Sequence, residues 1–202
     1  GGLPTIDRIE FQNVSFQYAT SRPVLNNINL TLERGQSLAI VGATGGGKTT
    51  LVNLLARFYE PTSGVITLDG VDYRERSLNF LQSNLGVVLQ TSHIFAGTVR
   101  ENIRYGQLSA TDEAIHAAAE SAGAAPMIKQ LDQGYDTMIE EGGSSLSSGQ
   151  KQLIAFTRAL LRDPQILIMD EATSSVDTIP EKRIEQGLRA LLKDRISVII
   201  AH

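Results

Sequence analysis

The stretch Gly42-Ala43-Thr44-Gly45-Gly46-Gly47-Lys48-Thr49 decides the fold class of this chain, because it matches the phosphate-binding pattern G-x-x-x-x-G-K-[ST] at every defined position. Glycines tolerate positive φ and carry no Cβ, so the backbone N–H groups of such a loop can converge on a polyphosphate. A short apolar strand is predicted before it, at 37–41, and a helix after it, whose N-terminal end adds positive charge. This order favours a P-loop over the alternative, a flexible Gly-rich turn.

The polar positions of this loop have predicted roles in binding a nucleoside triphosphate. Lys48 can reach the β- and γ-phosphates and is a predicted catalytic residue, and the Thr49 hydroxyl can bind Mg²⁺. The other predicted nucleotide contacts here are Gly42, Thr44, Gly45, Gly46, Gly47 and Thr50. By itself the loop predicts a site for a nucleoside triphosphate with Mg²⁺.

Length and composition limit the possible classes of protein. The chain has 202 residues, 42% of them hydrophobic, which suits one domain with an inserted subdomain or two small lobes. Its net charge of −4 argues against nonspecific nucleic-acid binding. The absence of cysteine excludes disulfides and thiolate metal sites, and no apolar run approaches the ~18 residues of a membrane span. Any membrane role is therefore expected to come from a partner or from a part of the protein outside these residues.

The pattern of apolar residues divides the chain into an α/β core and a helical insertion. Apolar segments predict strands at 8–18, 27–32, 37–41, 65–70, 85–90, 165–171 and 196–201, and the almost wholly apolar segment 85–90 is expected to be buried on both faces. Helical periodicity predicts helices at 50–57, 98–104, 111–122, 125–131, 150–161 and 179–193. We therefore predict a nucleotide-binding core of residues 1–90 and 165–202, with an N-terminal antiparallel β subdomain, and a helical subdomain at 91–164.

Two adjacent carboxylates end the strand predicted at 165–171. Asp170 follows four hydrophobic residues, and an Asp at the carboxyl end of a strand beside a P-loop can hold Mg²⁺, usually through water. Glu171 points differently and can orient a water on the γ-phosphate and accept its proton. The alternative, a solvated acidic pair at a strand end, is the weaker interpretation because a P-loop lies upstream.

The stretch Leu146-Ser147-Ser148-Gly149-Gln150 precedes the strongly amphipathic helix predicted at 150–161. Ser147 can cap that helix, and its neighbours offer N–H groups to an anion. Alone this would be no more than a capped helix start. Its position between a P-loop and an Asp-Glu strand makes it specific.

Together these motifs resemble, in order and over nearly the whole chain, the nucleotide-binding domain of ATP-binding cassette (ABC) transporters. The resemblance implies that Gly42–Thr49 is the Walker A motif, that Asp170 and Glu171 are the Walker B pair, and that 174–177 is the D-loop. It also implies that Tyr18 stacks on adenine, for which a strand-edge tyrosine is the alternative.

Other positions take implied roles from the same resemblance. Gln90 is at the Q-loop position, where the amide contacts Mg²⁺ and the attacking water, and His202 is at the position of the switch histidine that contacts the γ-phosphate. Glu171, His202, Gln90 and Lys48 are thus the predicted catalytic residues, and Thr49, Gln90 and Asp170 the predicted metal ligands. The signature LSGGQ is matched by 146–150, so Ser147, Gly149 and Gln150 are implied nucleotide contacts. His93 and His116 have no such context and are interpreted as surface or structural residues.

Two segments are similar to exporter cassettes in particular. They are 94–103 and 137–143, the second resembling the exporter X-loop with Glu141 at its acidic position. Two departures accompany them. Ser148 stands where the signature has its first glycine, and function is expected to be retained. Family members also continue after the histidine at which this chain ends, so a fragment or trimmed domain is expected.

The resemblance implies a P-loop NTPase (RecA-like) α/β core with an antiparallel β subdomain and an inserted helical subdomain. It implies an ATPase that uses ATP and Mg²⁺ to power export by head-to-tail dimerisation with a second cassette, identical or not. A transmembrane domain would be contacted through the regions of Gln90 and Glu141, holding the cassette at the cytoplasmic face of a membrane, and no nucleic-acid partner is expected. The alternatives are an ATP-sensing regulatory subunit of a heteromeric exporter and a soluble ABC ATPase.

Overall fold

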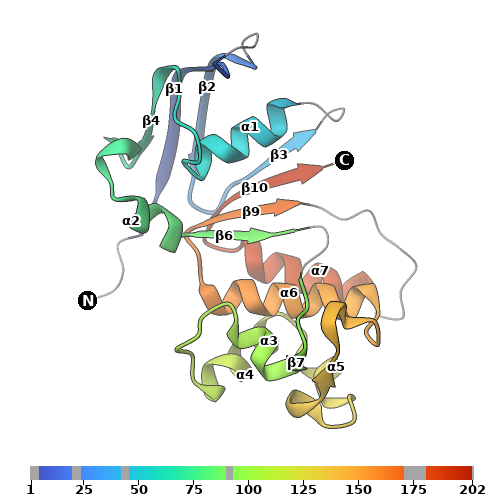
Figure 1. The fold of residues 1–202 in the computed structure, drawn as a ribbon. Coiled ribbons are helices and arrows are strands. Elements are labelled where there is room, and N and C mark those ends of the chain that lie inside the picture. The colour runs from blue at the N-terminus through green and yellow to red at the C-terminus, as the bar shows by residue number, and fades with distance from the viewer. Residues whose placement is uncertain (1–4, 20–23, 42–45, 90–92, 171–180, 202) are drawn as a thin grey trace. The chain divides into compact units, whose positions relative to one another are not determined.

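The computed structural model describes residues 5–19, 24–41, 46–89, 93–170 and 181–201, with the backbone alone at 41, 46–49 and 181. These residues form two compact units (Figure 1). The core unit comprises Gly1–Val87, Pro164–Glu171 and Asp194–His202, and the helical unit comprises Val88–Asp163 and Ala172–Lys193. The predicted subdomain boundaries, which follow the change from strand-like to helical periodicity, remain a prediction.

An antiparallel sheet opens the core unit, with strand order β2-β1-β4-β5. Its strands are β1 (Arg8–Phe16), β2 (Leu25–Glu33), β4 (Ser63–Leu68) and β5 (Val71–Asp72). In β1 the buried side chains are first Ile9 and Phe11 and then Val14 and Phe16, so the alternation slips by one residue. The slip falls at Asn13, whose φ is 50° and where the register with both neighbouring strands shifts, as a β-bulge requires.

A parallel sheet completes the core unit, with order β3-β10-β9-β6. Its strands are β3 (Ser37–Val41), β6 (Leu85–Val88), β9 (Ile166–Asp170) and β10 (Ile196–Ala201). The central strand β9 up to Met169 and the first half of β10 are buried on both faces, as their apolar sequences predict, whereas Ile199–Ala201 are half-buried. The same expectation for 85–90 is wrong at Val87, which is 50% exposed, because β6 is an edge strand of this sheet.

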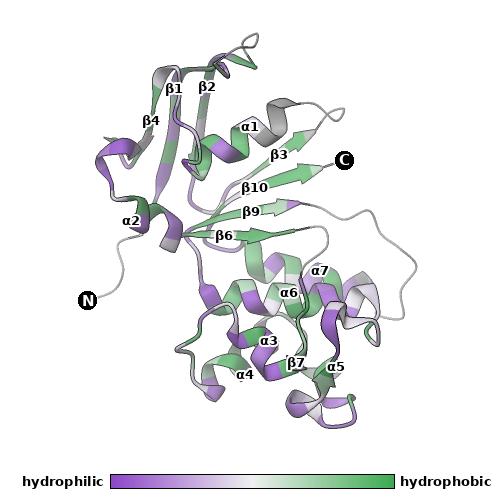
Figure 2. Cartoon of the chain, in the orientation of Figure 1, coloured by the Kyte–Doolittle hydropathy of each residue, from purple (hydrophilic) through white to green (hydrophobic). Residues whose placement is uncertain are grey.

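Helix α1 (Gly46–Leu55) lies between the two sheets (Figure 1). Its Leu51, Leu54 and Leu55 join one hydrophobic cluster with inward residues of both sheets. Figure 2 shows that hydrophobic residues predominate in β3, β10, β9 and β6, whereas α1 carries both hydrophobic and hydrophilic residues. Two short elements that the sequence pattern did not indicate follow β5: the 3₁₀ turn η1 (Tyr73–Glu75) and α2 (Leu78–Ser83).

In the helical unit, α6 (Ser148–Arg162) packs against three other helices. These are α3 (Val99–Arg104), α4 (Asp112–Ser121) and α7 (Glu181–Leu192). The unit also contains the helix α5 (Ala125–Lys129), the short strands β7 (Gly97–Thr98) and β8 (Met138–Ile139), and the 3₁₀ turns η2 (Gly134–Asp136) and η3 (Glu141–Gly143). A Cβ on Gly187 of α7 would lie 2.8 Å from the Phe156 ring and 2.7 Å from the Ala122 carbonyl oxygen. Glycine is therefore what lets α7 approach α6 so closely.

Candidate nucleotide-binding site

The Gly-rich loop joins β3 to α1, which is the order that the sequence predicts. β3 ends at Val41 and α1 begins at Gly46. Gly42, Thr44 and Gly45 lie outside the described residues, and of Gly46, Gly47, Lys48 and Thr49 the backbone forms the first turn of α1. Thr50, the last predicted contact of this stretch, is fully buried. The phosphate roles of these residues remain predictions.

Tyr18, two residues beyond β1, lies close to the start of α1. Its hydroxyl is 3.3 Å from the Thr50 Oγ1, within hydrogen-bond distance. Its ring meets the buried Phe16 edge to face, with centroids 4.8 Å apart and planes at 89°. A tyrosine predicted to stack on a base thus contacts the residue that follows the predicted metal ligand Thr49.

Asp170, the predicted Walker B aspartate, is the last residue of β9. The strand between β9 and β3 is β10, and its Ile200 pairs with both Asp170 and Ile40. Asp170 is therefore level with Ile40, one residue before β3 ends, and two strand spacings, ~10 Å, from it. Because the pairings are parallel, Asp170 and the start of the Gly-rich loop lie at the same edge of the sheet.

The stretch 146–150 begins α6 in the helical unit, as predicted. Ser147 is the N-cap, and its Oγ accepts a hydrogen bond from the Gln150 N–H at 3.1 Å. In return the Gln150 Oε1 accepts one from the Ser147 N–H at 2.8 Å, which completes a capping box. Gly149 is buried and Ser148 is exposed, so the serine that departs from the signature pattern projects outward. The capping role predicted for Ser147 is confirmed; the side-chain cap from Gln150 was not foreseen.

Two adjacent carboxylates fix the loop that leads to this helix. Glu141 accepts a hydrogen bond from the Ala96 N–H at 3.1 Å and lies 3.3 Å from the His93 Nε2. Glu140 instead accepts hydrogen bonds from the Ser144 hydroxyl, at 3.0 Å, and from both the N–H and the hydroxyl of Ser145. These donors lower the pKa of the Glu140 carboxyl to about 2. Sequence reasoning singled out Glu141 and missed Glu140, although Glu140 precedes the serine pair 144–145 that donates to it.

Several predicted residues cannot be placed. Gln90, Glu171, 174–177 and His202 lie outside the described residues. Among the residues that the structure describes, no three His, Cys, Asp or Glu side chains gather as a metal site. Of the predicted metal ligands, only Asp170 has a side chain that the structure describes. His93 is exposed, in agreement with its interpretation, and His116 stacks on the Tyr135 ring at 4.4 Å. None of the described helices is long and apolar enough to cross a bilayer.

Comparison with known proteins identifies the family. Residues 25–174 match the sequence model of the ABC transporter family. The chain belongs to this family. The match includes the Walker A, signature and Walker B motifs, whereas Tyr18 and His202 fall outside it. The predicted fold class, a P-loop NTPase α/β core with an antiparallel β subdomain and an inserted helical subdomain, is thereby confirmed.

The chain is similar to longer proteins of the ABC family. An uncharacterized ABC transporter ATP-binding protein of Bacillus subtilis is 52% identical over 96% of this chain, and an ATP-dependent lipid A-core flippase of Syntrophus aciditrophicus is 48% identical over 99%. A solved bacterial Atm1-family ABC exporter with ATP bound is 40% identical over 98% of the chain, with a TM-score of 0.83. This chain spans 32%, 33% and 34% of those proteins, or about a third of their length.

Proposed function

We propose that this chain is an ATP-binding and ATP-hydrolysing cassette that powers export of a substrate across a membrane. The observation that carries the proposal is the shared sheet edge, where the Gly-rich loop between β3 and α1 starts level with Asp170. Phosphoryl transfer needs positioning and charge neutralisation more than covalent chemistry, and the residues at this edge are proposed to supply both.

Residues of one chain are proposed to bind the nucleotide and prepare the water. Gly42–Thr49 and Thr50 cradle the phosphates, Lys48 neutralises charge on them, and Tyr18 stacks on the adenine. Mg²⁺ would be held by Thr49, Gln90 and Asp170, where it would neutralise charge between the β- and γ-phosphates. Glu171 orients the attacking water and accepts its proton, and His202 contacts the γ-phosphate. Asp170 supports this assignment because it ends a strand at the loop's edge of the sheet.

A second cassette is proposed to close the site from the opposite side. Ser147, Gly149 and Gln150 of that copy would face the γ-phosphate in a head-to-tail dimer. The capping box supports this role, because the Ser147 Oγ accepts from Gln150 and its hydroxyl hydrogen remains able to donate to a phosphate oxygen. A transmembrane domain, contacted through the regions of Gln90 and Glu141, would hold the cassette at the cytoplasmic face of the membrane and receive the cycle of dimerisation and release.

Glu171→Gln in the full chain tests the proposal. ATP-dependent dimerisation should persist while ATP turnover falls by ~10²-fold or more, because the water loses its proton acceptor. Glu185→Gln is the matched control: Glu185 is exposed on α7, its ion pair to Arg189 is a surface pair, and its loss should leave turnover unchanged. Turnover by Glu171→Gln close to that of the unmodified chain would refute the base assignment. Negligible turnover by the unmodified chain, with ATP binding retained, would favour an ATP-sensing subunit.

A further inference from the structure

The ring of Tyr18 is held by aromatic neighbours from two different segments. Phe16 comes from the end of β1, and Tyr59 comes from the turn after α1, 41 positions after Tyr18 in the chain. The Tyr18 and Tyr59 centroids are 5.4 Å apart with planes at 89°, and the Phe16 and Tyr59 centroids are 5.5 Å apart. Edge-to-face packing at these distances is the arrangement that aromatic quadrupoles favour. The orientation of the Tyr18 ring therefore depends on Tyr59 as well as on its own strand.

Backbone hydrogen bonds attach the Tyr59 turn to the segment that carries Tyr18. The Thr62 N–H donates to the Ser15 carbonyl oxygen at 2.9 Å, and the Gln17 N–H donates to the Thr62 Oγ1 at 3.0 Å. Residues immediately before Tyr18 and shortly after Tyr59 are thus tied together. The contact between the two rings is built on a fixed pair of backbones.

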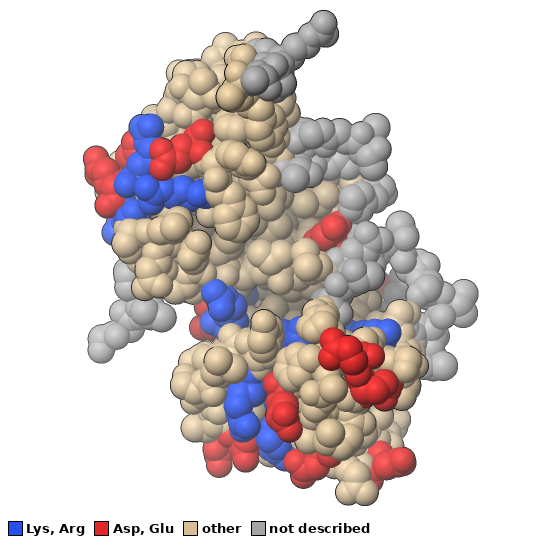
Figure 3. Space-filling view, viewed as in Figure 1, with Lys and Arg blue, Asp and Glu red and all other residues tan. Residues whose placement is uncertain are grey.

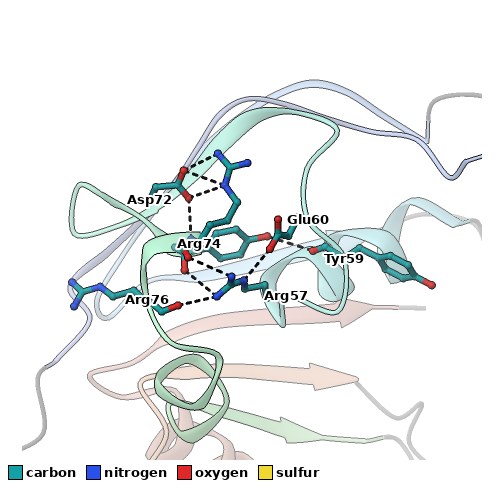
Figure 4. A network of polar contacts seen from close by, with 7 residues as sticks. Arg57, Tyr59, Glu60, Asp72, Arg74 and Arg76 are labelled. Carbon is teal, nitrogen blue, oxygen red and sulfur yellow. Dashed lines mark hydrogen bonds and ion pairs between the residues drawn. The ribbon is translucent and has the colours of Figure 1, made fainter.

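A polar network holds the other side of the same turn (Figure 4). Arg57, at the end of α1 with φ of 59°, has a side chain only 17% exposed, and it donates to the carbonyl oxygens of Tyr73, Arg74 and Arg76 at 3.5, 3.4 and 2.9 Å. Its Nε lies 3.2 Å from the Glu60 carboxylate. Burial raises the pKa of the Tyr73 hydroxyl, which stays protonated and donates to the Tyr59 carbonyl oxygen at 3.4 Å.

The network fixes the backbone of Tyr59 and leaves its ring outside. In Figure 4 the Tyr59 ring points away from Arg57. Its carbonyl oxygen, in contrast, accepts the hydrogen bond from the Tyr73 hydroxyl. The ring is 45% exposed, whereas Phe16 and Tyr73 are buried. A half-exposed aromatic on a turn anchored from both sides is better suited to support a neighbouring ring than to fill a core.

We infer that Tyr59 is a positioning residue for the nucleotide base: it holds the Tyr18 ring in the orientation in which a purine stacks on it. The inference rests on the proposed function, in which Tyr18 contacts the base. It adds a base-site residue from a segment that none of the predicted nucleotide contacts occupies. Tyr59 acts through Tyr18, and its effect is confined to ligands that carry a base.

The test compares two ligands on the full chain: ATP and inorganic tripolyphosphate, which has the phosphates but no base. Tyr59→Ala should weaken ATP binding by roughly three- to tenfold and leave tripolyphosphate binding unchanged, because one aromatic contact to Tyr18 is lost. Tyr59→Leu should behave like Tyr59→Ala, and Tyr59→Phe should restore ATP affinity. Phe58→Ala is the matched control, since Phe58 is a 66% exposed aromatic on the same turn, and it should change neither affinity.

A double-mutant cycle separates this inference from the function on which it rests. Tyr18→Ala should lower ATP affinity, and adding Tyr59→Ala should then have little further effect, because residues that act through one another are not additive. Independent, additive losses of ATP affinity would overturn the inference. So would a Tyr59→Ala variant whose ratio of ATP affinity to tripolyphosphate affinity is unchanged, whether both affinities fall equally or neither falls. If Tyr18→Ala itself leaves the ratio unchanged, the base contact proposed for Tyr18 fails, and the inference fails with it.

Discussion

In the core unit a cation fixes the turn that follows α1, whereas in the helical unit an anion fixes the loop that precedes α6. Arg57 donates to three carbonyl oxygens, and Glu140 accepts from two hydroxyls and one N–H. Charged side chains also gather near β4 and α2 on the core-unit face drawn in Figure 3. Arg74 and Asp72 of the core unit form an ion pair at 2.8 Å. In the two units, side chains of opposite charge therefore fix the segment next to a helix: Arg57 after α1 and Glu140 before α6.

The two anchors differ most in exposure. The Arg57 side chain is largely buried, so water does not readily replace the hydrogen bonds that its carbonyl partners lose when the side chain is removed. Glu140 is solvent-exposed, so water can satisfy its partners when it is lost. Similar numbers of hydrogen bonds should therefore contribute unequally to the free energy of unfolding: much in the core unit and little in the helical unit.

Removal of the cation should have the largest effect on stability. Arg57→Ala removes a donor from three carbonyl oxygens, of which that of Tyr73 keeps a second donor, the Arg76 N–H at 3.2 Å, and should lower the free energy of unfolding by about 2–3 kcal/mol, measured by urea denaturation. Arg57→Lys, which keeps the charge and loses the planar fork, should recover part of that loss. A change within 0.5 kcal/mol for Arg57→Ala, the range of ordinary surface substitutions, would remove the contrast between the two anchors.

The helix that the anionic loop leads to offers an intermediate test. Ser147→Ala should lower the free energy of unfolding by about 1 kcal/mol through loss of an N-cap. Thr111→Ala is matched to it, because the Thr111 side chain caps α4 of the same unit by accepting from the Ala114 N–H at 3.2 Å. Both variants should lose similar stability, but only Ser147→Ala should also slow ATP turnover. If Ser147→Ala and Thr111→Ala had equal ATP turnover, Ser147 would act only as the N-cap of α6.

Protonation of the Glu140 carboxylate should have the smallest effect on stability. The pKa of Glu140 is lowered from its ordinary value of 4.5 to about 2, so its stabilising contribution is complete above pH 4.5 and is lost as the pH falls toward 2. The Ser145 amide signal in NMR should therefore shift between pH 4.5 and 2 in the unmodified chain and show no such transition in Glu140→Gln. Glu113→Gln, an exposed glutamate in the first turn of α4, should leave that transition in place. A transition centred near 4.5 would mean that the hydrogen bonds do not persist in solution.

Sequence reasoning predicted the elements whose signals are local. The Ser147 cap, the helix after it and the apolar strand that ends at Asp170 follow from side chains next to one another in the chain, and all three are present. The strand-loop-helix order around the Gly-rich stretch is likewise a local pattern, and its described parts agree with it.

What could not be predicted depends on contacts between distant residues. The bulge at Asn13 is set by pairing with two other strands, and the exposure of Val87 depends on β6 being at an edge. Arg57 and Tyr59 show no motif, because apart from Glu60 their partners in the polar network and the ring contacts are 14 to 43 positions away. Glu140 was passed over because the family pattern drew attention to the neighbouring Glu141.

The shared pairing of β10 has a consequence for the order of assembly. β3 and β9, which end at the Gly-rich loop and at Asp170, do not touch each other; each pairs with β10, which follows both in the chain. Neither pairing can form on the ribosome until residues 196–201 have been synthesised. The sheet edge that brings the phosphate loop level with Asp170 therefore forms only after β10 has been synthesised, and a nascent chain lacking these six residues has β3 and β9 without the strand that joins them.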